Sequence, residues 1–251
     1  MKNSWIKTEK EIDLMKKSGL IASKALKKVR ENIKPGVSCK YLDDIARREI
    51  ELLGAKPSFM TVEDYKYTIC TTINEQVVHG IPTDRILKSG DIIGIDIGAL
   101  YNGFHSDLAI TVPVGKVSRQ TQNFLSHGES TLKKAITKAV PGNRIGDISS
   151  TIQDSIESAG YSVVKELTGH GVGKMLHEEP FIPGFGKPNT GPAIAENMTL
   201  AIEVIYTAGS GKIGLEKDNW TIAAADGSLG GLFEQTVLTS KSSPIVLTPY
   251  V

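Results

Sequence analysis

The sequence predicts an α+β fold of two similar halves, in which helices pack on one side of a continuous sheet. Three observations predict it: each half holds two helical patterns followed by strand patterns, the helix boundaries repeat along the chain, and no linker divides the 251 residues. Hydrophobic residues make up 40% and charged residues 23%, a balance that can bury a core. We therefore expect residues 1–251 to form one folded domain.

The first half begins with two helical patterns. Thr8 and Glu11 form a T-x-x-E capping box, after which apolar residues recur at helical spacing up to a stop at 34–36. Ser38 can cap a second helix that ends at Gly54.

The second half repeats this pattern. A third helical pattern, which runs through Phe124 and Leu132, stops at Pro141–Gly142, and a fourth stops at Gly160. Six positions match at an offset of 106 residues: Pro35 with Pro141, Gly36 with Gly142, Leu42 with Ile148, Ala46 with Ile152, Ile50 with Ile156 and Gly54 with Gly160. We interpret them as an internal duplication with α-α-β-β halves at about 8–115 and 118–248.

Charge and cysteine content narrow the classes of protein. The formal net charge of +1 gives no argument for a nucleic acid or an anionic membrane as partner. Residues 1–50 carry a basic excess, for which lysine-rich solvated helix faces are the simpler explanation. Cys39 and Cys70 form no metal or disulfide motif, and no apolar run is long enough to span a bilayer. We expect a cytoplasmic protein.

Acidic residues interrupt strand patterns in the first half. In the strand 91–100, Asp96 shares one face with Gly94 and Gly98, which predicts open space beside its carboxylate. The following strand places Asp107 among small residues on the matching face. A turn at 101–103 joins the two strands into a hairpin, so the two carboxylates are expected to lie close together.

Two more acids, Glu203 and Glu234, interrupt apolar strands of the second half. A single buried acid is best explained by an arginine or lysine partner. Four acids in strand interiors instead favour a metal ion, because carboxylates that lie together repel one another unless a cation neutralises them.

Histidine is the remaining ligand type. His79 and His170 each precede a glycine in a loop-like context. His127 falls inside the third helical pattern and is expected to be a solvated surface residue. His105 shares strand parity with Asp107 and is expected at the rim of the site or behind the ligands.

The motifs at 168–173 and 176–180 resemble those of type I methionine aminopeptidases of the bacterial short form. The resemblance runs from about Lys7 to Thr248, and its further motifs lie at 34–38, 74–75, 79–82, 90–96 and 103–107. It implies the pita-bread fold, a curved and mostly antiparallel sheet covered by helices.

The resemblance also implies a centre of two divalent metal ions, which the oxygen-rich ligands allow to be Co, Mn, Fe or Zn. Asp96 would be a terminal ligand of one ion, His170 and Glu203 would be ligands of the other, and Asp107 and Glu234 would bridge both.

The implied reaction is hydrolysis of the first peptide bond in peptides and nascent chains that begin with methionine. Glu234 would accept a proton, and His79 and His177 would donate hydrogen bonds to the reacting peptide. The methionine pocket would be formed by Tyr65, Cys70, Trp220, Phe59, Val62 and Leu176, of which the last three differ from the residues common in the family.

Two further positions differ from the family pattern. Val204 stands where proline is usual, and Gln235 stands where histidine is usual. By strand parity Gln235 faces away from Glu234, so we expect it to change packing or the surroundings of the ligands rather than the ligand set.

Two alternatives to the methionine enzyme stay open. Proline-specific peptidases share the fold and a similar ligand set, and a non-catalytic pita-bread module would bind protein or nucleic acid. The context of His177 and the presence of all five ligands favour the methionine enzyme. Ribosome association through the basic first 50 residues, with the protein as a monomer, is a further expectation.

Overall fold

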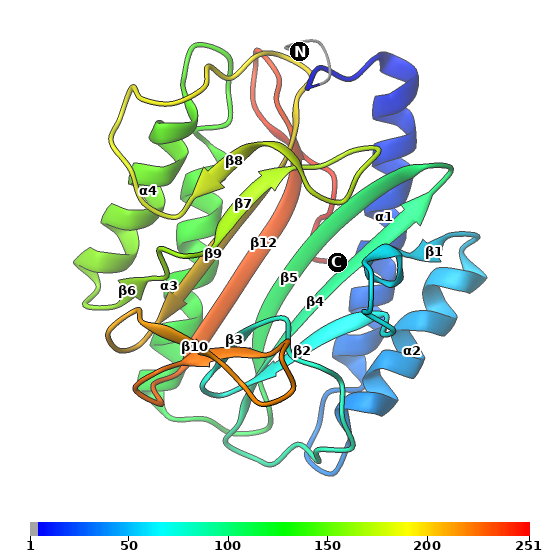
Figure 1. Cartoon of the computed structure of the whole chain (residues 1–251), viewed down its shortest axis with the longest axis vertical. Coiled ribbons are helices and arrows are strands. Elements are labelled where there is room, and N and C mark those ends of the chain that lie inside the picture. The colour runs from blue at the N-terminus through cyan, green and yellow to red at the C-terminus, as the bar shows by residue number, and fades with distance from the viewer. Residues whose placement is uncertain (1–4) are drawn as a thin grey trace.

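Two helix pairs, each followed by strands, make up residues 5–251, the part of the chain that this computed structural model describes (Figure 1). The helices are α1 (Glu9–Glu31), α2 (Cys39–Leu52), the short η2 (Phe59–Thr61), α3 (Arg119–Ile136) and α4 (Ile145–Ser158). The strands of the first half are β1 (Lys56–Pro57), β2 (Ile69–Ile73), β3 (Gln76–Val78), β4 (Ile92–Tyr101) and β5 (Phe104–Pro113). Those of the second half are β6 (Ser162–Val163), β7 (Thr168–Gly171), β8 (Glu178–Pro183), β9 (Thr199–Thr207), β10 (Ile213–Leu215), β11 (Ile222–Ala224), β12 (Gly230–Leu238) and β13 (Ile245–Val246).

The predicted caps of the first two helices are confirmed. Thr8 Oγ1 accepts from the Glu11 amide at 3.4 Å, and the Glu11 carboxylate accepts from the Thr8 amide at 2.9 Å. Ser38 Oγ accepts from the Tyr41 amide at 3.2 Å at the start of α2. Each cap satisfies amide groups that have no partner inside the helix.

The predicted end of the third helix is wrong. α3 ends at Ile136, before Pro141–Gly142. The Thr137 hydroxyl donates to the Lys134 carbonyl at 2.7 Å, and the amides of Lys138 and Ala139 bond to carbonyls three residues back. These tighter turns end the regular helix before the proline is reached.

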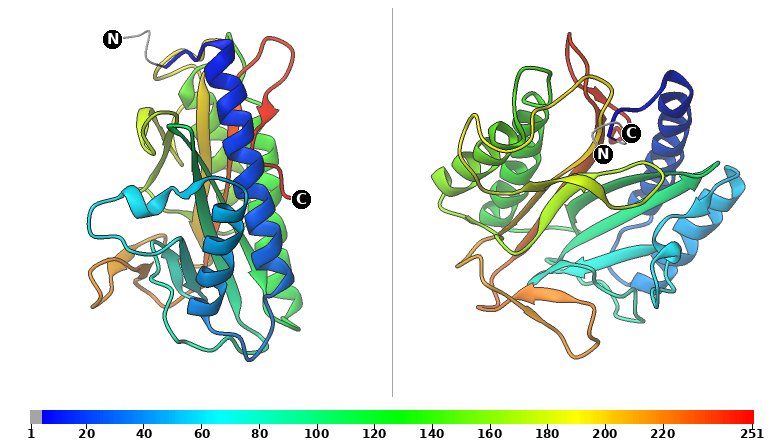
Figure 2. Two further views of the ribbon diagram at one scale, coloured as in Figure 1. Left: turned by 90° about the vertical axis from the view of Figure 1, so that its right-hand side faces the viewer. Right: turned by 45° about the horizontal axis from the view of Figure 1, so that its top comes forward.

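The main sheet runs through both halves in the order β1-β4-β5-β12-β9-β7-β8, and its strand pairs are antiparallel. The predicted curved antiparallel sheet is therefore confirmed. The helices α1 to α4 cover one face of it, and the shorter hairpins lie on the other (Figure 2). None of the helices formed by residues 5–251 combines the length and the apolar character that a membrane span requires.

The alternation predicted for β4 and β5 is confirmed. Ile93, Ile95 and Ile97 belong to the core cluster that also contains helix residues such as Leu26, so Asp96 faces away from the helices. The turn between the strands uses Asn102 and Gly103, both with positive φ angles of 47° and 83°.

Asp96 lines a cavity, as predicted, but the two glycines beside it do not create that open space. A Cβ atom at Gly94 would collide with the Thr72 hydroxyl, and one at Gly98 would lie 2.6 Å from the Ser106 carbonyl oxygen and 2.7 Å from Ser58 Cβ. The glycines admit neighbouring protein atoms rather than a ligand.

The glycines that match between the two halves have similar backbone conformations. Gly54 and Gly160 follow α2 and α4 with φ angles of 79° and 80°, and Gly36 and Gly142 precede those helices with φ angles of 91° and 101°. Left-handed residues of this kind favour glycine. The duplication itself stays a prediction that this agreement supports.

Candidate metal centre

The five side chains predicted as ligands converge on one cavity of about 140 Å³ on the face of the sheet away from the helices. Each comes from a different strand: Asp96 from β4, Asp107 from β5, His170 from β7, Glu203 from β9 and Glu234 from β12. Both halves of the chain therefore contribute to the site.

Strand register brings three of the acids into one row across the sheet. Asp96 pairs with Ala109 on β5, Ala109 also pairs with Glu234 on β12, and Glu234 pairs with Glu203 on β9. Asp107 lies two residues from Ala109 on the same face of β5. The row across β4, β5, β12 and β9 thus consists of three acids and Ala109. The Ala109 methyl group is fully buried.

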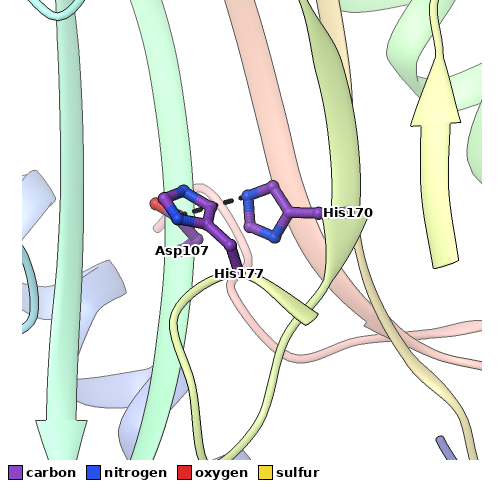
Figure 3. A group of neighbouring side chains, drawn as sticks. All are labelled: Asp107, His170 and His177. Carbon is purple, nitrogen blue, oxygen red and sulfur yellow. Dashed lines mark ion pairs between the residues drawn. The ribbon is translucent and has the colours of Figure 1, made fainter. Parts of the chain in front are cut away.

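The candidate ligand atoms form three overlapping groups, each within 4.8 Å: one contains His170, Glu203 and Glu234, another contains Asp96, Asp107 and Glu234, and the third contains Asp107, His170 and His177. Glu234 belongs to the first two. His170 Nε2 lies 3.4 Å from Glu203 Oε1 and 3.8 Å from Asp107 Oδ2, and Figure 3 shows His170 pointing at Asp107.

His170 is held with one ring nitrogen free to bind a cation. Its Nδ1 donates to the Gly171 carbonyl oxygen at 2.9 Å, which leaves the lone pair on Nε2 facing the acids. Burial lowers the pKa of His170 to about 4, so the ring is neutral at physiological pH.

Burial also raises the pKa of all four acids. The pKa of Asp96 rises to about 7. The pKa values of Asp107 and Glu234 rise well above their ordinary range because burial disfavours the charge and the neighbouring acids repel it, and that of Glu203 rises for the same two reasons.

No lysine or arginine among residues 5–251 forms an ion pair with these acids, and the His170 ring beside Asp107 and Glu203 is neutral. The buried oxygens Asp96 Oδ1, Asp107 Oδ1 and Glu234 Oε1 have no hydrogen-bond partner in the described chain. Oxygen atoms of this kind, beside a neutral imidazole and without a thiolate, fit a hard or borderline divalent cation.

The other histidines occupy different positions. His177 and His79 line the cavity and are exposed, and the His177 ring meets the His170 ring edge-on with centroids 4.5 Å apart. His105 is buried, does not line the cavity and lies 2.6 Å from Ser58 Oγ through its Nδ1. The helical pattern predicts a solvated His127. In the structure His127 on α3 is half-buried and its ring packs against the Tyr161 ring.

The wall of the cavity beside the acids is apolar. All six residues predicted for the pocket line it: Phe59, Val62, Tyr65, Cys70, Leu176 and Trp220. The Tyr65 and Trp220 rings pack with centroids 5.1 Å apart, and the Tyr65 hydroxyl donates to the Ile69 carbonyl at 2.8 Å. Val78 also lines this cavity, and sequence patterns gave no signal for it.

The two departures from the family pattern face the helices. Gln235 lies between Phe233 and Val237, which pack in the main core, and its Nε2 donates to the Thr248 carbonyl oxygen at 2.9 Å. Val204 is fully buried in the same core. Neither side chain lines the cavity.

A cavity lined by five ligand-type side chains fits a metal-binding protein, and the family comparison identifies its class as the metallopeptidases. A model of "Metallopeptidase family M24" matches residues 13–239. Methionine aminopeptidase 1 of Bacillus subtilis (strain 168) is 44% identical over 242 residues, which cover 96% of this chain and 98% of that protein. The crystal structure of methionine aminopeptidase from Thermotoga maritima superposes with a TM-score of 0.95 at 39% identity and covers 97% of this chain and 98% of that one.

The chain therefore belongs to metallopeptidase family M24, and within it to the methionine aminopeptidases. Prolidase from Pyrococcus furiosus has the same fold but is less similar. It gives a TM-score of 0.80 at 26% identity, and the match covers 99% of this chain but 66% of the prolidase chain.

Proposed function

We propose that the protein removes the N-terminal methionine from peptides and nascent chains by metal-dependent hydrolysis. The observation that carries this proposal is that one cavity is lined both by the carboxylates of the centre and by an apolar pocket. The likeness to the Bacillus subtilis methionine aminopeptidase over almost the whole chain supports the choice of substrate.

We assign two divalent ions to the centre. Asp96 would hold one, His170 and Glu203 would hold the other, and Asp107 and Glu234 would bind both. Membership of Glu234 in two ligand groups supports its bridging role. Four carboxylates and two divalent ions also balance in charge, which removes the repulsion that raises the carboxyl pKa values. Co, Mn, Fe and Zn all suit this donor set.

When bound, such ions supply Lewis-acid activation of the attacking water and of the peptide carbonyl. The chain's own residues then move and hold protons. We assign Glu234 as the acceptor of a proton from the attacking water, because its carboxylate lies buried at the centre of the cluster. His177 and His79 line the same cavity and would donate hydrogen bonds to the oxygen or nitrogen of the cleaved bond.

The apolar pocket would take the methionine side chain. Tyr65, Trp220 and Leu176 form its aromatic and aliphatic walls, and Cys70 lies directly opposite Asp96 in the strand register. The pocket thus ends beside the acidic row, so a side chain seated in it places its own backbone at the centre. If that residue is the first of the peptide, the lone pair of its free amino group could bind a metal ion held by the acids, which would select an unblocked N-terminus.

The test is a peptide assay on protein reconstituted with Mn or Co. Met-Ala-Ser should be cleaved, and formyl-Met-Ala-Ser should not, because the formyl group removes the free amine. Cleavage of Xaa-Pro peptides alone would transfer the assignment to the prolidase-like alternative. Failure of the reconstituted protein to retain any metal would favour the non-catalytic binding module.

Ribosome association is a second proposal, which rests on the basic excess of residues 1–50. The described part of this segment displays Lys17, Lys24 and Lys27 on exposed positions of α1. Co-sedimentation with ribosomes that weakens with added salt would support it. We further propose a cytoplasmic monomer, which size-exclusion chromatography and cell fractionation would test.

A further inference from the structure

The loop between β7 and β8, residues 172–177, carries two residues that line the cavity, Leu176 and His177. Figure 3 shows His177 on this loop beside His170. The His177 side chain is exposed, and its ring contacts the His170 ring edge-on. The contacts of the loop therefore contribute to the position of the ring.

Glu178, the residue after His177, ties the loop to the N-terminal segment. Its Oε2 accepts from Lys7 Nζ at 2.8 Å, and the two side chains are 16% and 5% exposed. Its Oε1 accepts from the Met175 amide at 3.1 Å. One carboxylate thus joins the lysine to both ends of the turn that presents His177.

Lys7 is itself anchored to the sheet. Its backbone amide donates to the Asn197 carbonyl at 2.8 Å, and the preceding Ile6 forms an antiparallel bridge with Met198, next to β9. The lysine therefore links the loop to the strand that supplies Glu203.

Gly173 makes room for this link. A Cβ atom at this position would lie 2.7 Å from Lys7 Cε and 2.8 Å from Glu178 Oε1. The Gly173 carbonyl accepts from the His105 amide at 2.7 Å, which ties the loop to β5 as well. The last glycine of the 168–173 motif is thus needed by the ion pair.

We infer that Lys7 is a positioning residue, whose ion pair with Glu178 holds the 172–177 loop so that His177 is aligned with the peptide to be cleaved. The inference rests on the proposed function of His177. Lys7 does not line the catalytic cavity, so its effect on turnover would pass through the loop.

The experiment compares Lys7→Met with the double variant Lys7→Met/Glu178→Gln, both loaded with Mn. The single variant leaves the carboxylate without its lysine, whereas the double variant removes that charge and keeps the side-chain shape. Lys133→Met is the matched control, since Lys133 is exposed and pairs with Glu129 on α3, outside the 172–177 loop. Measurements are kcat and KM on Met-Ala-Ser, Tm, metal content, and hydrogen exchange of the 172–178 amides in metal-free protein.

For Lys7→Met we expect kcat to fall about tenfold or more, because small misplacements of a reacting group are costly, with KM within about twofold of wild type. Metal content should be unchanged, and the amides of Gly173 and Met175 should exchange faster. In the double variant Tm should recover while kcat stays low. The Lys133→Met control should match wild type.

Recovery of kcat together with Tm in the double variant would overturn the inference, since the pair would then act on stability alone. Unchanged kcat in Lys7→Met would also overturn it. If Lys7→Met fails to fold, Glu178→Gln alone carries the same expectations. Absence of peptide cleavage by the wild type would count against the proposed function, while the exchange measurement would still test the loop contact.

Discussion

Glu203 on β9 lies directly opposite Glu234 on β12, in the register of an antiparallel pair whose side chains face the cavity. Like charges in directly opposed positions destabilise a sheet unless something neutralises them. In the described chain no lysine or arginine pairs with either glutamate, and the His170 ring beside Glu203 is neutral. The sheet thus places charges where a cation is needed for both carboxylates to ionise.

Glu234→Gln should abolish cleavage and lower the metal content, because Glu234 shares one ligand group with Asp96 and Asp107 and another with His170 and Glu203. Gln235→Ala is the matched neighbour. It removes the hydrogen bond to the Thr248 carbonyl on the helix side, so it should lower Tm and keep the metal. Elemental analysis and Tm of both variants check this. Equal metal loss in the two variants would contradict the bridging assignment.

Ala109→Val should weaken metal binding although it removes no ligand. The Ala109 methyl group lies in the row between Asp96 and Glu234, so two added methyl groups would occupy the space between their carboxylates. Ala109→Gly is the control, which keeps that space and should cost about 1 kcal/mol of strand stability. Calorimetric titration with Mn should give weaker binding for valine than for glycine. The reverse order would show that the row does not hold the metal.

Asp96→Asn should stabilise the metal-free protein at pH 8. Burial raises the pKa of Asp96 from its ordinary value of 3.8 to about 7, so between these values the folded state keeps a proton that the unfolded chain has lost. The stability from this group is present below the lower value and is lost as the pH rises through about 7. The variant should therefore melt about 5 °C above wild type at pH 8, with a smaller difference at pH 5.

The pKa of His170 shifts in the opposite direction, from 6.5 to about 4. Its contribution to the stability of the fold is therefore present above about 6.5 and is lost as the pH falls from there to about 4. This contribution is common to wild type and Asp96→Asn, so the difference in Tm between them reports the Asp96 carboxyl group together with its repulsion of the other three acids. With saturating Mn the order should reverse, because the wild type binds the metal more tightly. A metal-free Asp96→Asn variant that melts below wild type at pH 8 would contradict the repulsion argument.

Much of the site could be predicted because its signals are local. Alternation and the turn at 101–103 were enough to place Asp96 and Asp107 on one face of one hairpin. Ala109 had no such signal, because its importance comes from the pairing of β5 with β12, strands more than a hundred residues apart. In the sequence Lys7 cannot be distinguished from the other N-terminal lysines. Its role depends on tertiary contacts with Glu178 and Gly173.

Two local predictions failed because neighbours decided the outcome. Side-chain and short-range backbone bonds after Ile136 end α3 before the proline that marked its predicted stop. The glycines around Asp96 accommodate Thr72 and Ser58, so Gly94 and Gly98 reflect packing between neighbouring segments and not space for a ligand. The carboxylate was correctly singled out, but for a partly wrong reason.

Trp220→Ala should loosen recognition of the first side chain. Its ring packs on Tyr65 and lines the cavity, so its loss widens the pocket. KM for Met-Ala-Ser should rise roughly tenfold, the effect expected for loss of about 1 to 2 kcal/mol of apolar contact, with a smaller change in kcat. Trp220→Phe, which keeps an aromatic wall, should stay near wild type. An unchanged KM in Trp220→Ala would place the methionine elsewhere.

His177→Ala should lower kcat by roughly a hundredfold, the usual effect of removing one hydrogen-bond donor to the transition state, and should leave metal content intact. His177 meets His170 edge-on and forms a candidate ligand group with Asp107 and His170, but it comes from a loop and not from the row of acids. His170→Ala is the matched comparison, in which one ring of the same contact is lost and metal content should fall with activity. His127→Ala, on the far helix α3, should change neither. Parallel loss of metal and activity in His177→Ala would make His177 a ligand and would end its assignment as a donor to the substrate.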